Sequence, residues 1–168
     1  EQKIKLKPNP YNTAETTLTI PIEKENGATV NVLFIGKLNI QKGVLNLAKA
    51  IPGVVKAFQN VNFIFIGNNG SSPIMGVSMR AYLEERLKGF NNITFTGAIT
   101  LEDVPNFLAE ADICVIPSLW ENFPYVCLEA MSAGRAVIGS NKGGMSEMLA
   151  DGAGILIEPT DYKQIEEA

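Results

Sequence analysis

Short apolar runs alternate with amphipathic segments along the chain from Thr29 onward. Several runs are nearly continuous in Val, Ile and Phe, which is typical of strands buried on both faces of a sheet. The predicted strands are 29–36, 61–68, 92–97, 111–118, 136–140 and 153–159. The helix-like segments between them are 43–59, about 77–89, 101–110, 126–134 and 144–150.

Repeated alternation of strand and helix predicts parallel strands joined by right-handed crossovers. We therefore expect an α/β fold, with a doubly wound, Rossmann-like sheet of six parallel strands in the order 3-2-1-4-5-6 and helices on both faces. Thr100 begins a T-x-x-D pattern that is typical of a helix start. Pro105 indicates that the helix at 101–110 is short or bent.

The two ends of the chain fit this pattern poorly. Residues 1–28 resemble an extended linker that leads into one domain at 29–168. The last residues, DYKQIEEA, are helix-like, so both ends look cut from something longer and the domain looks truncated at its C-terminal end.

Composition narrows the class of protein. Of 168 residues, 46% are apolar and 19% charged, which is typical of a globular domain. A net charge of -4 argues against nucleic-acid binding driven by charge. No apolar run approaches the ~20 residues that span a bilayer, and no signal peptide opens the sequence, so we expect a cytoplasmic protein.

Cys114 and Cys127 lie in apolar segments and are interpreted as buried free thiols in a reducing compartment. The sequence contains no histidine, which excludes a Ser-His-Asp triad and a histidine metal site within this chain. We expect no metal ion and no cofactor.

Two unusual loops are predicted to meet at one edge of the sheet. In the expected strand order the first and fourth strands are neighbours, and ligands bind beyond the carboxyl ends of the strands where the order reverses. The loop after the first strand is GKLNIQKG, with Lys37 and Lys42, and the loop after the fourth is SLWENFPY, with Glu121.

The first loop has the residues of a phosphate site. Gly36 and Gly43 allow close approach of a ligand, and Lys37 and Lys42 would bring two positive charges to one spot, which suits a diphosphate. Pro124 lies near the start of the next helix, whose free amide groups favour an anion. Neither a G-x-G-x-x-G fingerprint nor a Walker A motif is present, which argues against a nicotinamide cofactor and against ATP hydrolysis.

Carboxylates beside a diphosphate need a reason, because like charges repel. Glu121 and Glu129 would bracket the phosphate site, and carboxylates accept hydrogen bonds from vicinal hydroxyl groups. A nucleotide sugar has a ribose on one side of its diphosphate and a hexose on the other, so each glutamate could take one. Trp120 is interpreted as an aromatic that anchors its loop, and Glu147 as a charge at a helix start.

The sequence resembles the C-terminal, donor-binding domain of the group 1 (family 4) retaining glycosyltransferases, which have the GT-B fold. The similarity runs from the PNP of residues 8–10 to about Asp161. It is carried by G-K-L-x-x-x-K-G at 36–43, F-x-G at 95–97, ADICVIPSLWENFP, LEAMSAGRAVIGSNKGGMSE, the E-x7-E at 121 and 129, and GG-x-x-E at 143–147.

The resemblance implies a role for each site residue. Glu129 would hold the ribose hydroxyls and Glu121, the catalytic residue, would contact the transferred sugar. The diphosphate would be bound by the lysines and by amides of the second loop, and the base would lie against backbone after the third strand. The implied donor-binding residues are Gly36, Lys37, Lys42, Ala98, Ile99, Asn122, Phe123, Pro124, Tyr125, Val126 and Glu129.

The sequence departs from the family pattern at two places. Lys37 stands where the family usually has arginine, which keeps the charge and loses the bidentate contact. Asn122-Phe123-Pro124 replaces the commoner G-F-G or S-F-G, and Pro124 has no amide hydrogen to donate.

The resemblance implies the donor-binding half of an enzyme that transfers a hexosyl group from a nucleoside diphosphate sugar to a glycan, lipid or small-molecule acceptor. An absent N-terminal domain would supply the acceptor site and any contact with the inner membrane face, so this half alone is expected to transfer nothing. Two alternatives stay open: a stand-alone nucleotide-binding or regulatory module, and a sugar-nucleotide epimerase of the same architecture. The base (uracil, guanine or adenine), the sugar and the acceptor are not predicted.

Overall fold

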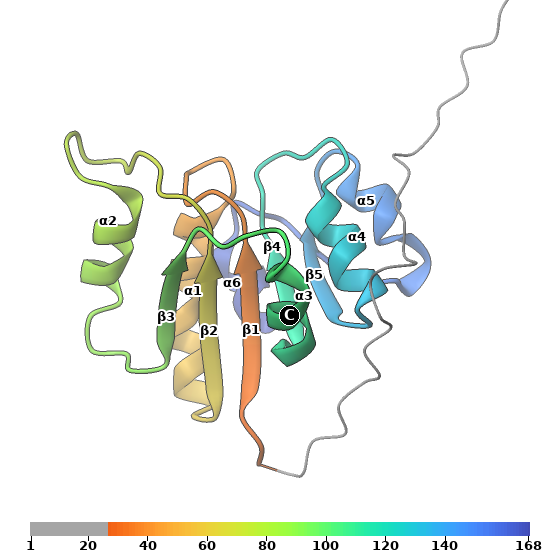
Figure 1. The fold of residues 1–168 in the computed structure, drawn as a ribbon, viewed down its shortest axis with the longest axis horizontal. Coiled ribbons are helices and arrows are strands. Elements are labelled where there is room, and N and C mark those ends of the chain that lie inside the picture. The colour runs from red at the N-terminus through yellow and green to blue at the C-terminus, as the bar shows by residue number, and fades with distance from the viewer. Residues whose placement is uncertain (1–26) are drawn as a thin grey trace, which may run out of the picture.

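The computed structural model describes residues 27–168, which contain one sheet of six parallel strands (Figure 1). The strands are β1 Val30–Ile35, β2 Val61–Ile66, β3 Ile93–Gly97, β4 Ile113–Ile116, β5 Ala136–Ser140 and β6 Ile155–Ile157. Their order is β3-β2-β1-β4-β5-β6, and each neighbouring pair is parallel. The predicted fold class and strand order are confirmed.

Helices cover both faces of this sheet. They are α1 Val44–Ala57, α2 Met79–Arg86, α3 Val104–Glu110, α4 Tyr125–Ser132, α5 Met145–Met148 and α6 Tyr162–Glu167, with a 3-10 turn at Ala150–Gly152. Residues of α1, α2 and α6 form one buried cluster with the sheet, and residues of α3, α4 and α5 form a second cluster. The four inner strands β1, β2, β4 and β5 therefore lie between two apolar layers.

The alternation within β1 explains its apolar run. Val32 and Phe34 belong to the cluster that contains α1, whereas Leu33 belongs to the cluster that contains α3, α4 and α5. Because successive side chains of a strand point to opposite faces, the part of β1 that is covered on both sides, 32–35, is apolar at every position.

Helix α3 begins later than the T-x-x-D pattern predicted. The first helical residue is Val104, and Pro105 lies in the first turn. Thr100 is not the N-cap; its hydroxyl donates to Asp103 Oδ2 at 2.7 Å. Proline cannot donate to a carbonyl one turn earlier, so a helix starting at residue 101 would lose a hydrogen bond, whereas proline in the first turn costs nothing.

The other predicted elements are present, with ends at or close to the predicted residues. The segment DYKQIEEA contains α6, where Asp161 Oδ1 accepts from the Lys163 amide at 3.0 Å. All but the last two residues of the predicted linker, 1–28, lie outside the described residues. Within 27–168, no helix has the length and apolar character needed to cross a membrane. In the same range, no three side chains of the His, Cys, Asp and Glu types gather as a metal site would require.

Candidate functional site

The loop between β1 and α1 lies against the loop between β4 and α4, as the strand order predicted. Strand β1 pairs with β4, and the Leu119 amide donates to the Gln41 carbonyl at 2.8 Å. Gly43 has φ 73°, and a β-carbon there would lie 1.8 Å from the Pro117 carbonyl oxygen. Only glycine allows this approach, so Gly43 sets the distance between the two loops.

Lys42 and Glu121, one from each loop, form an ion pair. Glu121 Oε1 accepts from Lys42 Nζ and also from Ser118 Oγ at 2.9 Å. The side chain of Glu121 is 14% exposed, and that of Lys42 is 33% exposed. Asn39 Oδ1 accepts the Lys42 amide at 2.9 Å, which fixes the backbone of the lysine. The first glutamate is therefore held by charge and by hydrogen bonds.

Glu129, unlike Glu121, has no side-chain partner among the described residues. It lies in α4, is half-buried, and its carboxylate makes no hydrogen bond or ion pair with the residues of 27–168. Burial raises the pKa of this carboxyl above its usual value. A carboxylate that loses water without gaining a partner costs free energy, so Glu129 is disposed to accept hydrogen bonds from a ligand.

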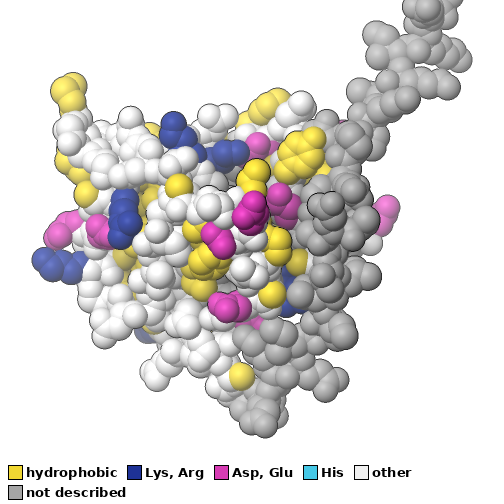
Figure 2. All heavy atoms as spheres, in the orientation of Figure 1, with side chains coloured by type: hydrophobic (Ala, Val, Ile, Leu, Met, Phe, Trp, Pro, Cys, Tyr) yellow, Lys and Arg dark blue, Asp and Glu magenta, His cyan; other side chains and the backbone are white. Residues whose placement is uncertain are grey.

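A cavity of about 540 Å³ opens at the carboxyl ends of β1, β2 and β3. Among the predicted residues, Gly36, Lys37, Ala98 and Ile99 line it. Sequence reasoning missed seven further lining residues: Ile35, Ile66, Gly67, Asn68, Asn69, Leu101 and Val104. The Asn68 and Asn69 pair directly follows a buried strand, and the rule that ligands bind at carboxyl ends could have found it. Figure 2 shows basic and acidic side chains together along this edge of the sheet.

The predicted helix start beside Pro124 is present, and the anion site proposed there stays a prediction. Pro124 is the N-cap, and the amides of Tyr125 and Val126 begin the helix, where no carbonyl lies one turn earlier to accept them. The adjoining residues Asn122 and Phe123 are exposed and half-buried, respectively. The start of α4 thus directly follows the loop that carries Glu121.

Trp120 does not anchor its loop, contrary to the interpretation from sequence. Its side chain is 56% exposed. The loop is held instead by backbone hydrogen bonds on both sides of Trp120. The Leu119 amide donates to the Gln41 carbonyl, and the Glu121 carbonyl accepts the Gly144 amide at 2.9 Å. Backbone bonds of this kind leave the tryptophan free to face solvent.

Glu147 lies in the first turn of α5, as predicted, and is exposed. Cys114 and Cys127 are free and buried, also as predicted. Burial raises the pKa of Cys114 to about 12 and that of Cys127 to about 11. Both thiols remain protonated at neutral pH and are unreactive.

The family model described as group 1 glycosyl transferases matches residues 29–168. The chain belongs to this family. A glycosyltransferase of Methanocaldococcus jannaschii without an assigned activity is 33% identical over 121 residues, which are 70% of this chain and 29% of that protein. The chain spans about a third of the length of the curated relatives that it matches.

Solved structures of other glycosyltransferases share the fold. The C-terminal domain of the group 1 protein LpcC of Francisella tularensis superposes with a TM-score of 0.76 at 24% identity, covering 92% of this chain and 84% of that one. Anabaena HepE, solved in complex with UDP and glucose, has a TM-score of 0.71 at 23% identity, covering 83% of this chain and 37% of that one. The six-stranded domain is therefore one half of a GT-B fold.

Proposed function

We propose that this chain is the donor-binding half of a glycosyltransferase that transfers a hexosyl group, with retention of configuration, from a nucleoside diphosphate sugar. The observation that carries the proposal is the contact between Lys42 and Glu121 where the strand order reverses. Family membership and the UDP held by HepE support it.

The diphosphate is bound by Lys37, Lys42 and the amides at the start of α4. Lys42 already contacts Glu121. A lysine between a carboxylate and a diphosphate offsets their repulsion, which explains how Glu121 is tolerated beside the phosphates. The two lysines supply the positive charge, and no metal ion takes part in the proposed binding.

Each glutamate recognises one sugar. Glu129 accepts from the ribose hydroxyls, since its carboxylate has no partner among the described residues. Glu121 contacts the transferred sugar with the carboxylate that Lys42 and Ser118 hold in place. That contact strengthens as positive charge develops on the departing sugar, which lowers the barrier to transfer. The base lies in the cavity beside Ala98 and Ile99.

The acceptor site belongs to a second domain of the complete enzyme. Transfer requires both partners to be held together, so donor binding alone does not produce turnover. Any contact of the enzyme with a membrane is assigned to that second domain.

The test first screens UDP, GDP and ADP and their glucose forms by thermal shift, then titrates the best pair into variants. Glu129→Gln weakens the diphosphate and the sugar nucleotide alike, by about 1.5–3 kcal/mol, as expected for hydrogen bonds to a charged group. Glu121→Gln weakens only the sugar nucleotide. Exposed Glu147→Gln is the matched control and changes neither affinity.

Melting temperature separates binding from folding. The raised pKa of Glu129 means that the folded state holds the proton more tightly, so this residue costs stability once the pH exceeds its ordinary pKa. Glu129→Gln removes that cost and should not lower the melting temperature at pH 7. The proposal is wrong if both variants give one ligand profile, or if either lowers the melting temperature and leaves binding unchanged.

A further inference from the structure

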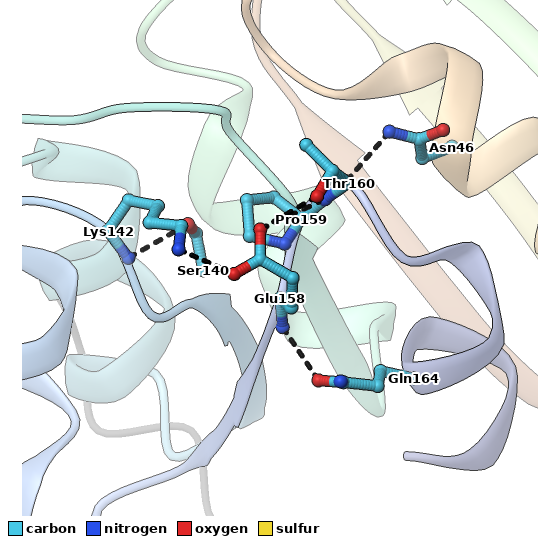
Figure 3. A network of polar contacts seen from close by, with 7 residues as sticks. All are labelled: Asn46, Ser140, Lys142, Glu158, Pro159, Thr160 and Gln164. Carbon is cyan, nitrogen blue, oxygen red and sulfur yellow. Dashed lines mark hydrogen bonds and ion pairs between the residues drawn. The ribbon is translucent and has the colours of Figure 1, made fainter.

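A network of polar contacts joins the carboxyl ends of β5 and β6 (Figure 3). Lys142, just after β5, pairs with Glu158 Oε2, just after β6, at 2.5 Å. The Lys142 amide donates to Ser140 Oγ at 3.1 Å. Glu158 Oε1 accepts from Thr160 Oγ1 at 2.9 Å, and the Glu158 amide donates to Gln164 Oε1 at 2.8 Å. Both partners of the ion pair are thus fixed at their backbones.

One side of this network reaches Glu121. Gly143 and Gly144 follow Lys142 directly, and the Gly144 amide donates to the Glu121 carbonyl at 2.9 Å. A β-carbon on Gly143 would lie 1.9 Å from that same oxygen. The turn after β5 therefore packs directly against the backbone of Glu121.

The other side reaches Lys42. Asn46 Nδ2 donates to the Pro159 carbonyl at 2.7 Å, which ties the first turn of α1 to the segment after Glu158. Lys42 lies four residues before Asn46 and pairs with Glu121. The segment 158–159 is thus connected to both members of the Lys42–Glu121 pair.

The Lys142–Glu158 pair contributes little to global stability. The side chains are 41% and 27% exposed, and ion pairs at such exposure contribute little because water and salt screen them. The hydrogen bond from Lys142 holds the pKa of Glu158 below its usual value, so this carboxyl stays ionised at neutral pH. Its importance therefore lies in where it places the turn at 141–144.

We propose that Lys142 and Glu158 are positioning residues that hold Glu121 in place for the sugar of the donor. This rests on the proposed function, in which Glu121 contacts that sugar. Neither residue touches the donor; they act through Gly143, Gly144 and the Glu121 backbone.

The experiment uses the whole 168-residue chain with Lys142→Met, Glu158→Gln and the double variant. Glu84→Gln, which breaks an exposed ion pair with Arg80 on α2, is the matched control. Hydrogen exchange measures the Gly144 amide. Calorimetry measures the nucleoside diphosphate and its glucose form that the thermal-shift screen selects, written below as UDP and UDP-glucose. Each single variant accelerates Gly144 exchange and lowers the affinity ratio of UDP-glucose to UDP, both about three- to tenfold, with UDP affinity and melting temperature unchanged. The control changes none of these.

The double variant should lose no more selectivity for UDP-glucose than either single variant, because each substitution breaks the same ion pair. If Lys142→Met weakens UDP binding while Glu158→Gln does not, Lys142 is a direct donor contact and the positioning role is wrong. Unchanged Gly144 exchange in both single variants also overturns it. A wild-type chain that binds none of the UDP, GDP and ADP ligands of the screen would refute the proposed function, while the exchange rates would still decide whether the pair holds the loop.

Discussion

Lys42 has two partners in the proposed complex, Glu121 and the diphosphate. Comparing ligands with and without the diphosphate isolates the second contact. Its ammonium contacts Glu121 in the structure and the diphosphate in the proposal. We predict that Lys42→Ala weakens UDP binding by about 1.5–3 kcal/mol, the range for hydrogen bonds to charged groups. Uridine, which lacks the diphosphate, should bind with unchanged affinity. Isothermal titration of both ligands measures the difference.

Lys37 provides the comparison for Lys42. It is exposed and lines the cavity at the ends of β1 to β3. Lys37→Arg should preserve or tighten UDP binding, because guanidinium makes a bidentate contact with phosphate. Lys37→Ala should weaken it.

Two results would contradict these roles. Equal losses of affinity for uridine and UDP in Lys42→Ala would place that lysine away from the phosphates. An unchanged UDP affinity in Lys37→Ala would leave Lys37 as a solvated surface charge.

At the level of elements, the start of α1 and the end of β4 are in contact through Gly43 and Pro117. We predict that Gly43→Ala destabilises the fold by about 2–5 kcal/mol, the sum of left-handed strain and overpacking. Denaturant unfolding followed by circular dichroism measures this loss. UDP affinity should fall too, since Lys42 and Glu121 flank the contact.

Gly76→Ala is the matched control for Gly43→Ala. Gly76 has φ 77°, close to the 73° of Gly43, but a β-carbon on Gly76 would have no neighbouring atom within 4 Å. This variant should be destabilised only by the strain of a left-handed backbone at alanine, about 1–2 kcal/mol. Equal losses of stability in the two variants would mean that the close approach of Gly43 to Pro117 does not contribute to the cost of Gly43→Ala.

On the scale of the whole molecule, an acidic protein is proposed to bind an acidic ligand. The net charge is -4, so attraction must come from the local lysines of the site. We predict that raising NaCl from about 0.05 M to about 0.5 M weakens UDP binding roughly three- to tenfold, because salt screens the partly exposed lysines. Uridine binding should not change. Titrations over this salt range measure both, and a UDP affinity independent of salt would contradict the lysine clamp.

The fold was predictable because its signals are local. Strands buried on both faces require continuous apolar runs, and the crossover rule turns their alternation with helices into a parallel sheet. The error at Thr100 is local as well: a capping pattern competed with Pro105, and the missing amide hydrogen of the proline decided where α3 begins. Trp120 was misread because the backbone bonds that hold its loop have no signature in side-chain type.

The residue types at the carboxyl ends of the strands follow from the amino-acid order alone. The pairing of Lys42 with Glu121, 79 residues away, depends on the folded chain, as does the lack of a partner for Glu129 among residues 27–168. The link from Glu158 to the Glu121 loop, through Lys142 and Gly144, likewise exists only in three dimensions. Strand patterns record burial, which repeats along the chain, whereas the partner of a charge depends on distances in space between segments that are remote in sequence.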